Sequence, residues 1–372
     1  MSRRFRPTEA EIDLDAIRHN VRTLKPPGSE LMAVVKANGY GHGDVAVARA
    51  AVDAGATWLG VALVEEGVRL RDAGVPGPVM VLTEFPPGSE RDALAANLTP
   101  VVYTDDGLRG LSVAAGALGR PVGAHVKLDT GMHRVGLHPD RAEEFVGTLL
   151  ESGLGFDGLW THFAKADDPE DPFVAQQFEW LLEVVGKLEA AGMTPRYRHI
   201  ANSAAVMALP RAHLDMVRLG VAMYGLSPGP KLAGLADLRP ALSWRTAVSM
   251  AKRVGAGEAV SYGLRYRLDR ESTIATIPVG YADGYGRGLT GKAEVLIRGR
   301  RYRVAGTVCM DQVMVDCGDD PVQGGDEVVL IGRQGDGAIT ADEVAGWLGT
   351  INYEVVCGLS DRVPREYRGE SG

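Results

Sequence analysis

The sequence is poor in cysteine: it has three in 372 residues, Cys309, Cys317 and Cys357. Their number is odd and their spacing fits no common metal-binding pattern, which argues against a disulfide framework and against a zinc site. We therefore expect a site without a metal, and we expect the three thiols to pack as small apolar side chains.

Long hydrophobic runs are also missing. The start of the chain, MSRRFRPTEAEIDLDAIRHN, has basic residues but no apolar stretch behind them, and no uninterrupted apolar span elsewhere approaches the ~20 residues of a membrane helix. We expect a cytoplasmic protein with no membrane partner. The formal net charge of −8 argues against non-specific nucleic-acid binding and favours a small molecule as the partner.

What the chain does contain is an alternating pattern over its first two thirds. Short β-branched runs alternate with segments of helical length and periodicity, such as DVAVARAAVDAG. The expected strands are 31–35, 58–62, 78–82, 100–103, 123–128, 156–162, 196–200 and 215–218. Eight strand–helix units fit an α/β fold of the closed (β/α)8 TIM-like barrel type, and a doubly wound open sheet is the main alternative.

The pattern changes after a segment rich in proline and glycine, 225–242. Short alternating runs separated by glycine turns follow, and these indicate antiparallel strands. We expect a barrel domain over residues 1–238 and a mainly β domain over 239–372. The stretch TADEVAGWL predicts one helix in the second domain, with Thr340 as its N-cap and Glu343 as the capping-box partner.

A barrel places functional residues just beyond the C-terminal ends of its strands. The polar residues in those positions are Lys36, Arg134, His162, Ser203 and Arg218. The chain has only eight lysines against 32 arginines, and five apolar residues precede Lys36. A buried amine loses solvation of its charged form, so its pKa falls and the nucleophilic form that a Schiff base requires becomes available.

Each of these residues also has an ordinary structural explanation. Lys36 could be a solvated loop residue, and His162 could be a hydrogen-bonded core histidine. Arg134 and Arg218 could form structural ion pairs, and Ser203 could cap the helix that follows it. Their convergence on one rim favours a functional role.

Three glycine-rich or small-residue segments could bind a phosphate through backbone N–H groups: NGYGHG, ANSAA and RLGVAMYG. None matches the fingerprint of a dinucleotide or nucleoside triphosphate site. A single phosphate on a small cofactor fits these segments better.

These motifs together carry a family resemblance. AVVKANGYGHG resembles the cofactor-lysine motif of alanine racemases, which are pyridoxal-phosphate enzymes of fold type III, built from a barrel and a β domain. The resemblance continues in the family's order through KLDTGMHRVG, THFAKAD, ANSAA, VRLGVAMYG, VSYG, PVGYADGY, VCMDQ, INYE and VPREY. It covers nearly the whole chain, and the departures, such as His133 and Val221, are minor.

The resemblance implies a role for each matching residue. Lys36 corresponds to the lysine that binds pyridoxal 5'-phosphate and serves as one base, and Tyr262 to a second base supplied by the partner subunit of a homodimer. Two bases are needed because the proton leaves one face of the α-carbon and returns on the other. Arg218 corresponds to the residue at the pyridine nitrogen, and because guanidinium keeps its proton it only donates a hydrogen bond there.

The remaining roles follow from the same resemblance. His162 would connect Arg218 to the tyrosine. The other cofactor contacts are Tyr40, Ser203, Gly220, Val221 and Tyr353; the substrate contacts are Arg134 and the Met310 backbone amide; the entrance residues are Tyr281 and Asp311. Lys127 matches a lysine that is often N6-carboxylated, and we expect that modification here.

The resemblance thus implies an isomerase that interconverts L- and D-alanine and supplies D-alanine for peptidoglycan. The nearest alternative is a racemase of the same fold with broader specificity, acting on serine or longer amino acids. A non-catalytic pyridoxal-phosphate carrier would lack the β domain and its tyrosine. A decarboxylase of this fold would show a glycine-triplet phosphate motif and an acid at the ring nitrogen, which the matching positions lack.

Overall fold

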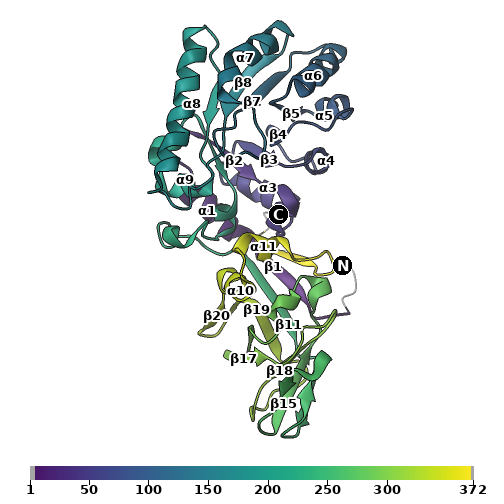
Figure 1. The fold of residues 1–372 in the computed structure, drawn as a ribbon. Coiled ribbons are helices and arrows are strands. Elements are labelled where there is room, and N and C mark those ends of the chain that lie inside the picture. The colour runs from purple at the N-terminus through teal and green to yellow at the C-terminus, as the bar shows by residue number, and fades with distance from the viewer. Residues whose placement is uncertain (1–4, 370–372) are drawn as a thin grey trace. The chain divides into compact units, whose positions relative to one another are not determined.

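A computed structural model describes residues 5–369, which form two compact units. The barrel unit comprises Asp15–Gly39 and Gly43–Pro240. The β unit comprises the described residues up to Leu14, the short segment Tyr40–His42 and the described residues from Ala241 onward. Figure 1 labels many of the helices and strands of each unit.

The barrel unit is built on parallel strands, as the sequence predicts. They are β2 (Glu30–Val34), β3 (Trp58–Val61), β4 (Val79–Val81), β5 (Leu98–Thr99), β6 (Val101–Val102), β7 (Gly123–Lys127), β8 (Gly155–Trp160), β9 (Tyr197–His199) and β10 (Met216–Leu219). One sheet has the order β10-β2-β3-β4-β5 and the other β6-β7-β8-β9. Each of the eight expected strands overlaps an observed one.

Two connections join these sheets into a barrel. Pro100 separates β5 from β6 because it has no N–H to donate, yet its carbonyl accepts a hydrogen bond from the His125 N–H at 3.0 Å, so β5 and β6 act as halves of one strand. At the other seam, β9 meets β10 through the Arg218 N–H, which donates to the Ala201 carbonyl at 3.0 Å. The open-sheet alternative is therefore excluded.

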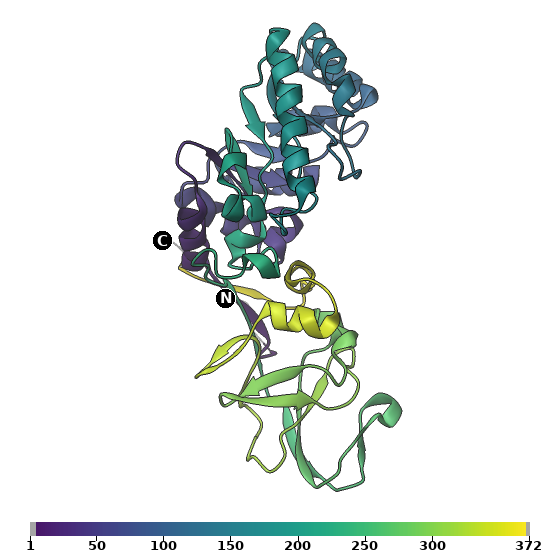
Figure 2. The same ribbon diagram turned by 60° about the vertical axis from the view of Figure 1, so that its left-hand side comes forward.

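Helices cover the outside of the barrel (Figure 1). They are α1 (Leu14–Leu24), α3 (Asp44–Asp53), α4 (Val64–Asp72), α5 (Glu90–Ala95), α6 (Asp105–Leu118), α7 (Ala142–Glu151), α8 (Pro172–Ala190) and α9 (Ser203–Ala208). The longest, α8, begins where the Asp171 side chain accepts the Phe173 N–H, with Pro172 in the first helical position. Figure 2 shows α8 as the long teal helix beside the strands.

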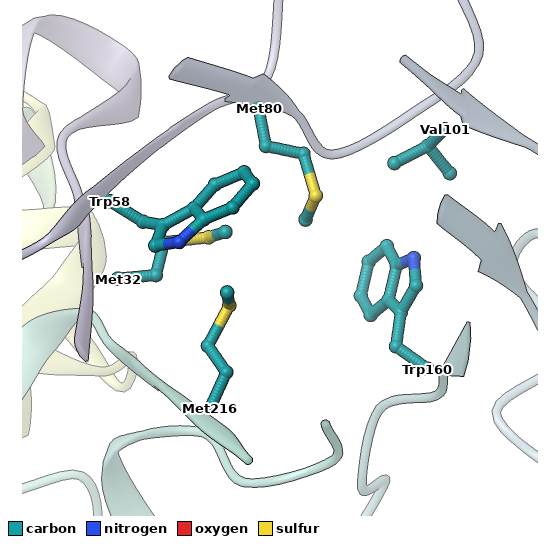
Figure 3. Packing of buried hydrophobic residues seen from close by; sticks show 6 residues of the cluster. All are labelled: Met32, Trp58, Met80, Val101, Trp160 and Met216. Carbon is teal, nitrogen blue, oxygen red and sulfur yellow. The ribbon is translucent and has the colours of Figure 1, made fainter. Parts of the chain in front are cut away.

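The barrel interior is filled with side chains and is not a channel. Figure 3 shows large apolar side chains from different strands converging on its centre: Met32, Trp58, Met80, Val101, Trp160 and Met216. Each is less than a tenth exposed. Burying a side chain of this kind stabilises a fold by about 1.5–3 kcal/mol, so this layer holds the strands of the barrel together.

The β unit is a ten-stranded, mainly antiparallel sheet with the order β12-β15-β18-β17-β16-β19-β11-β1-β21, and β20 pairs with β19. The strands are β1 (Glu9–Asp13), β11 (Leu242–Ala247), β12 (Met250–Val254), β15 (Ser272–Ile277), β16 (Glu294–Ile297), β17 (Arg300–Val304), β18 (Val313–Asp316), β19 (Glu327–Gln334), β20 (Gly337–Ile339) and β21 (Arg365–Arg368). Strands β13 (Ala259–Val260) and β14 (Tyr266–Arg267) form a separate hairpin.

The helices of the β unit are α10 (Ala341–Leu348) and α11 (Asn352–Cys357). As predicted, the Thr340 hydroxyl caps α10 by accepting the Glu343 N–H at 3.1 Å. The Glu343 carboxylate differs from the capping-box expectation because both of its oxygens bind Arg301.

The N-terminal strand differs from the expected boundaries. Residues 1–238 were expected to form one unit, but β1 pairs antiparallel with β11 and parallel with β21 in the β unit. Its alternating burial, with Ala10 and Ile12 inside, suits a sheet with one covered face. The cysteines also differ: Cys317 is buried, but Cys357 is exposed. Within residues 5–369, no helix has the length and apolar character to span a bilayer.

Candidate active site

The turn that carries Lys36 follows β2 and has an unusual backbone. In the segment α2 (Lys36–Tyr40), Ala37, Asn38 and Gly39 have φ of 52°, 52° and 59°, and Tyr40 has φ of 51°. Left-handed backbone costs a residue other than glycine roughly 1–2 kcal/mol, so consecutive residues of this kind need support from their surroundings. Lys36 itself is half-buried, which is less than the burial that the sequence suggested for its amine.

Cationic side chains gather at the C-terminal ends of the barrel strands. Lys127, the last residue of β7, is buried, and its pKa is lowered to about 7 by that burial and then by the positive charges of Arg134, Arg218 and Lys36. Asp129 opposes this shift. The Lys127 Nζ lies 4.6 Å from the centre of the Trp160 ring. An anion placed here would meet several positive charges.

Arg218, on β10, is buried and surrounded by neutral acceptors. Its guanidinium donates to the carbonyls of Thr161 at 2.9 Å and Ile200 at 3.0 Å. It also contacts His199 Nδ1 at 2.9 Å and His162 Nδ1 at 3.1 Å. Because guanidinium can only donate, both histidines must accept at Nδ1 and carry their proton on Nε2.

The pKa values of these histidines agree with that assignment. Burial, and after it the charge of Arg218, holds the pKa of His162 and of His199 well below the ordinary value. His199 Nε2 lies 3.1 Å from His125 Nδ1, so the hydrogen bonds continue inward from Arg218 through two neutral rings. Burial lowers the pKa of His125 to about 3. These hydrogen-bonded histidines help to fix the orientation of the Arg218 guanidinium, and with it the direction of its remaining N–H groups.

Ser203 is at the start of α9, but it is not the cap of that helix. Asn202 is the N-cap, because its side chain accepts the Ala205 N–H at 3.1 Å. The Ser203 hydroxyl instead accepts the Gly220 N–H at 2.9 Å and the Ala222 N–H at 3.3 Å. Ser203, Gly220 and Val221 thus meet in one place, as a small phosphate site would require.

Arg134 is on an exposed loop that Asp129 holds in shape. The Asp129 Oδ1 accepts the N–H groups of Gly131 and His133, each at 3.0 Å. A β-carbon on Gly131 would come within 2.4 Å of the Phe173 ring, and Gly131 has φ of 117°, so this loop needs glycine there. The guanidinium of Arg134 is therefore accessible, and the loop that carries it is held by the hydrogen bonds to Asp129.

The other predicted residues lie in the β unit. The Tyr40 and Tyr353 rings are 6.2 Å apart, and burial, followed by the neighbouring Tyr353 and Cys357, raises the pKa of Tyr40. Tyr262 is 73% exposed on the turn η5 (Tyr262–Leu264). The Thr307 hydroxyl donates to the Tyr262 carbonyl at 2.8 Å and holds that turn.

Tyr281 and Met310 are exposed nearby in the same unit, and their segments are joined by hydrogen bonds. Tyr281 N–H donates to the Cys309 carbonyl, and Ala282 N–H to the Met310 carbonyl, each at 3.0 Å. A β-carbon on Gly280 would come within 2.3 Å of both those carbonyls, so glycine is required. The Asp311 carboxylate is bound by Arg362 at 2.8 Å.

Comparison with known proteins identifies the family. The model of the alanine racemase N-terminal domain matches residues 12–228, and that of the C-terminal domain matches residues 241–367. The chain belongs to the alanine racemase family. A relative named alanine racemase, from Symbiobacterium thermophilum, is 50% identical over 371 residues, which are 99% of this chain and 98% of the relative.

Solved structures of the alanine racemase family agree with this fold. The alanine racemase of a D-cycloserine-producing Streptomyces lavendulae matches with a TM-score of 0.95 and 42% identity, covering 99% of each chain. A histidine racemase from Leuconostoc mesenteroides also matches, with a TM-score of 0.89, 29% identity and 99% of each chain covered. The same architecture therefore occurs in proteins named for different amino acids.

Sequence reasoning on this family member missed three buried polar residues: His125, His199 and Glu66. His125 left a readable signal, because it precedes Lys127 by two residues on one strand and so shares its face. His199 lies in the expected strand 196–200 and is the last residue of the observed strand β9. Glu66 gave no signal, since its contact with Ala37 joins an ordinary surface helix to a turn 29 residues earlier.

Proposed function

We propose that this chain is an alanine racemase that interconverts L- and D-alanine with pyridoxal 5'-phosphate bound through Lys36. One observation carries the proposal: the positive charges of Arg134, Arg218 and Lys36 all lower the pKa of the buried Lys127, which lies at the C-terminal end of β7. The carboxylate of Asp129 opposes this lowering of the Lys127 pKa. A site of this charge is suited to an anionic cofactor and an anionic substrate.

The residues present fit the cofactor. A phosphate dianion would suit the donors around Ser203, Gly220 and Val221, and the hydroxyls of Tyr40 and Tyr353 would complete its contacts. Arg218 would face the pyridine nitrogen, and its partners Thr161, His162, Ile200 and His199 fix its orientation. Since Arg218 retains its proton, the ring nitrogen would receive a hydrogen bond and not a full proton, which limits side reactions.

Pyridoxal phosphate supplies an electron sink that acidifies the α-hydrogen of a bound amino acid. The chain's own residues then move the proton. Lys36 Nζ would take it from or return it to one face of the α-carbon, and Tyr262 Oη would serve the other face. The neutral His162, which accepts from Arg218 at Nδ1, leaves its Nε2–H to donate toward the tyrosine oxygen.

We propose that Tyr262 serves the site of a second copy of the chain, in a homodimer. The 73% exposure of this tyrosine and the exposed Leu264 and Met310 support this arrangement. Hydrogen bonds of Ser261 and Thr307 join the turn of Tyr262 to the segment 307–309, which directly precedes Met310 in the β unit. Exposed apolar surface of this kind is typical of a protein interface.

The substrate carboxylate would bind Arg134 and the Met310 N–H, a charge-assisted contact that fixes which α-bond faces the bases. Tyr281 and Asp311 would shape the entrance. We propose that Lys127 is carboxylated on Nζ, because its lowered pKa of about 7 leaves a substantial neutral fraction able to react with carbon dioxide. The resulting anion would orient Arg134.

The cellular role that follows is D-alanine supply for peptidoglycan in the cytoplasm. The experiment that tests the function is spectroscopic and kinetic. Purified protein incubated with pyridoxal phosphate should absorb as a protonated imine, and borohydride followed by peptide mapping should locate the label on Lys36. A panel of L-alanine, L-serine and L-histidine should give fastest racemisation with alanine; a label elsewhere or a preference for histidine would refute the proposal.

A further inference from the structure

Glu66 connects the helix α4 to the turn that carries Lys36. Its Oε1 accepts the Ala37 N–H at 2.6 Å. Its Oε2 accepts the N–H groups of Ala62 at 2.8 Å and Leu63 at 3.1 Å. Glu66 is 8% exposed, so one buried carboxylate satisfies three backbone donors from two separate segments.

Helix capping explains only half of this arrangement. Glu66 is the third residue of α4, and a glutamate there commonly reaches back to the N–H groups that begin its own helix. The Oε2 contacts are of this kind. The Oε1 contact goes to Ala37, the residue directly after Lys36, and contributes nothing to α4. The carboxylate therefore has a second task on the neighbouring turn.

That turn needs support because of its backbone. Ala37 and Asn38 are in the left-handed region, where a side chain other than glycine is disfavoured. Charge-assisted hydrogen bonds to backbone N–H groups are stronger than neutral ones. The Ala37 N–H is thus held by the strongest kind of acceptor that a side chain offers, at the point where the strain begins.

A second contact from α4 reaches the far end of the same turn. Arg69 Nε donates to Asp44 Oδ2 at 2.6 Å, and the Asp44 N–H donates to Asn38 Oδ1 at 3.2 Å. Residues three apart on a helix share a face, so Glu66 and Arg69 both present themselves to this turn. Because Arg69 is exposed and Glu66 is buried, the glutamate is the stronger of the two supports.

We propose that Glu66 is a positioning residue that holds the left-handed turn. It thereby fixes the direction in which the Lys36 amine points toward the cofactor and the α-carbon of the substrate. This inference rests on the proposed function, in which Lys36 holds the cofactor and moves the proton. Glu66 contacts neither substrate nor cofactor in this scheme; it acts through the Ala37 peptide.

The test uses Glu66→Gln, which keeps the size of the side chain, with Glu65→Gln as the matched control on the same helix. Glu65 is exposed. In Glu66→Gln, an NH2 group replaces one of the two carboxylate oxygens. This donor must then face either the Ala37 N–H or the N–H groups of Ala62 and Leu63, and the hydrogen bonds on that side are lost. Hydrogen exchange by mass spectrometry on cofactor-free and cofactor-loaded protein should show peptides spanning 36–43 exchanging at least about 10-fold faster in Glu66→Gln only.

The loaded enzyme supplies the second readout. Glu66→Gln should lower kcat for alanine by about 10- to 100-fold, a size typical of a misplaced catalytic group, with KM changed less than 3-fold and the imine absorbance shifted or weakened. Glu66→Asp should not restore these values, because its shorter side chain does not reach both segments. Wild-type exchange in 36–43, or faster exchange with unchanged kcat and spectrum, would overturn the inference.

These outcomes are separable from failure of the proposed function. If the wild-type chain did not form an imine at Lys36, the proposed function would fail and with it the assignment of Glu66 to that chemistry. The exchange measurement on cofactor-free protein would still decide whether Glu66 holds the turn.

Discussion

The neutral histidines inside the barrel should make this protein sensitive to mild acid. His125 is completely buried, and that burial lowers its pKa from 6.5 to about 3. In the unfolded chain its pKa returns to the ordinary value. As the pH falls below 6.5, the unfolded state therefore binds a proton that the folded state does not accept, and the free energy of unfolding decreases until about pH 3.

The magnitude follows from the two pKa values. Each pH unit inside this window costs about 1.4 kcal/mol, so moving from pH 7 to pH 5 should remove about 2 kcal/mol on account of His125 alone. His162 and His199 have pKa values shifted in the same direction and add to the loss. Few carboxylates titrate above pH 5, so the comparison of pH 7 with pH 5 avoids most of the protonation of aspartate and glutamate.

The assay is urea unfolding followed by tryptophan fluorescence at several pH values and one protein concentration. Trp58 lies edge-on to His125, with ring centres 5.6 Å apart, so emission reports on this region. In His125→Gln, the loss between pH 7 and pH 5 should shrink by about 2 kcal/mol relative to wild type. In the control His138→Gln, an exposed position, it should not change. Equal pH slopes for wild type and His125→Gln would refute the reasoning.

Three further predictions concern the site and the fold. Tyr262→Phe should lower alanine racemisation by about 10²–10⁴-fold while the imine absorbance stays. Mixing this variant with Lys36→Ala should restore about a quarter of wild-type activity, since half of the dimers then hold one intact site. No recovery of activity on mixing would contradict a shared site. Intact mass spectrometry at neutral pH should find carbon dioxide added to Lys127, lost in Lys127→Ala; an unmodified lysine would contradict carboxylation. Thr340→Ala should destabilise the β unit by about 1 kcal/mol in urea unfolding because the Glu343 N–H loses its cap, and an unchanged midpoint would contradict that role.

The strands of the barrel could be predicted because their information is local. Each expected strand from 31–35 to 215–218 overlaps an observed one, and the hairpin β16–β17 turns through Arg298 and Gly299 with φ of 52° and 77°, the kind of two-residue turn that short alternating runs indicate. The place of β1 could not be predicted. Its partners β11 and β21 lie far along the chain, and a five-residue alternating run does not specify which sheet it joins.

The candidate active site also has features that could be predicted from the sequence and features that could not. The positions of Lys36, Arg134, His162, Ser203 and Arg218 followed from the rule that barrel strands end at one rim. The left-handed turn after Lys36 could not be read, because Ala37 is an ordinary helix former whose conformation is imposed by Glu66 and its surroundings. The chain of hydrogen bonds from Arg218 through His199 to His125 could not be predicted from the sequence either. It depends on which side chains point into the barrel at the same level.

The pairing of β1 with β11 and β21 determines when this strand can join its sheet during translation. Strand β1 is translated before the barrel strands, whereas its partners β11 and β21 are translated after them. The barrel can collapse as soon as β10 leaves the exit tunnel, because domains of a nascent chain generally fold as units. Strand β1 meanwhile lacks both of its sheet partners, and its backbone groups stay unpaired until β11 and then β21 have been translated. The barrel can thus be folded before the sheet of the β unit takes up the strand that precedes it in the chain.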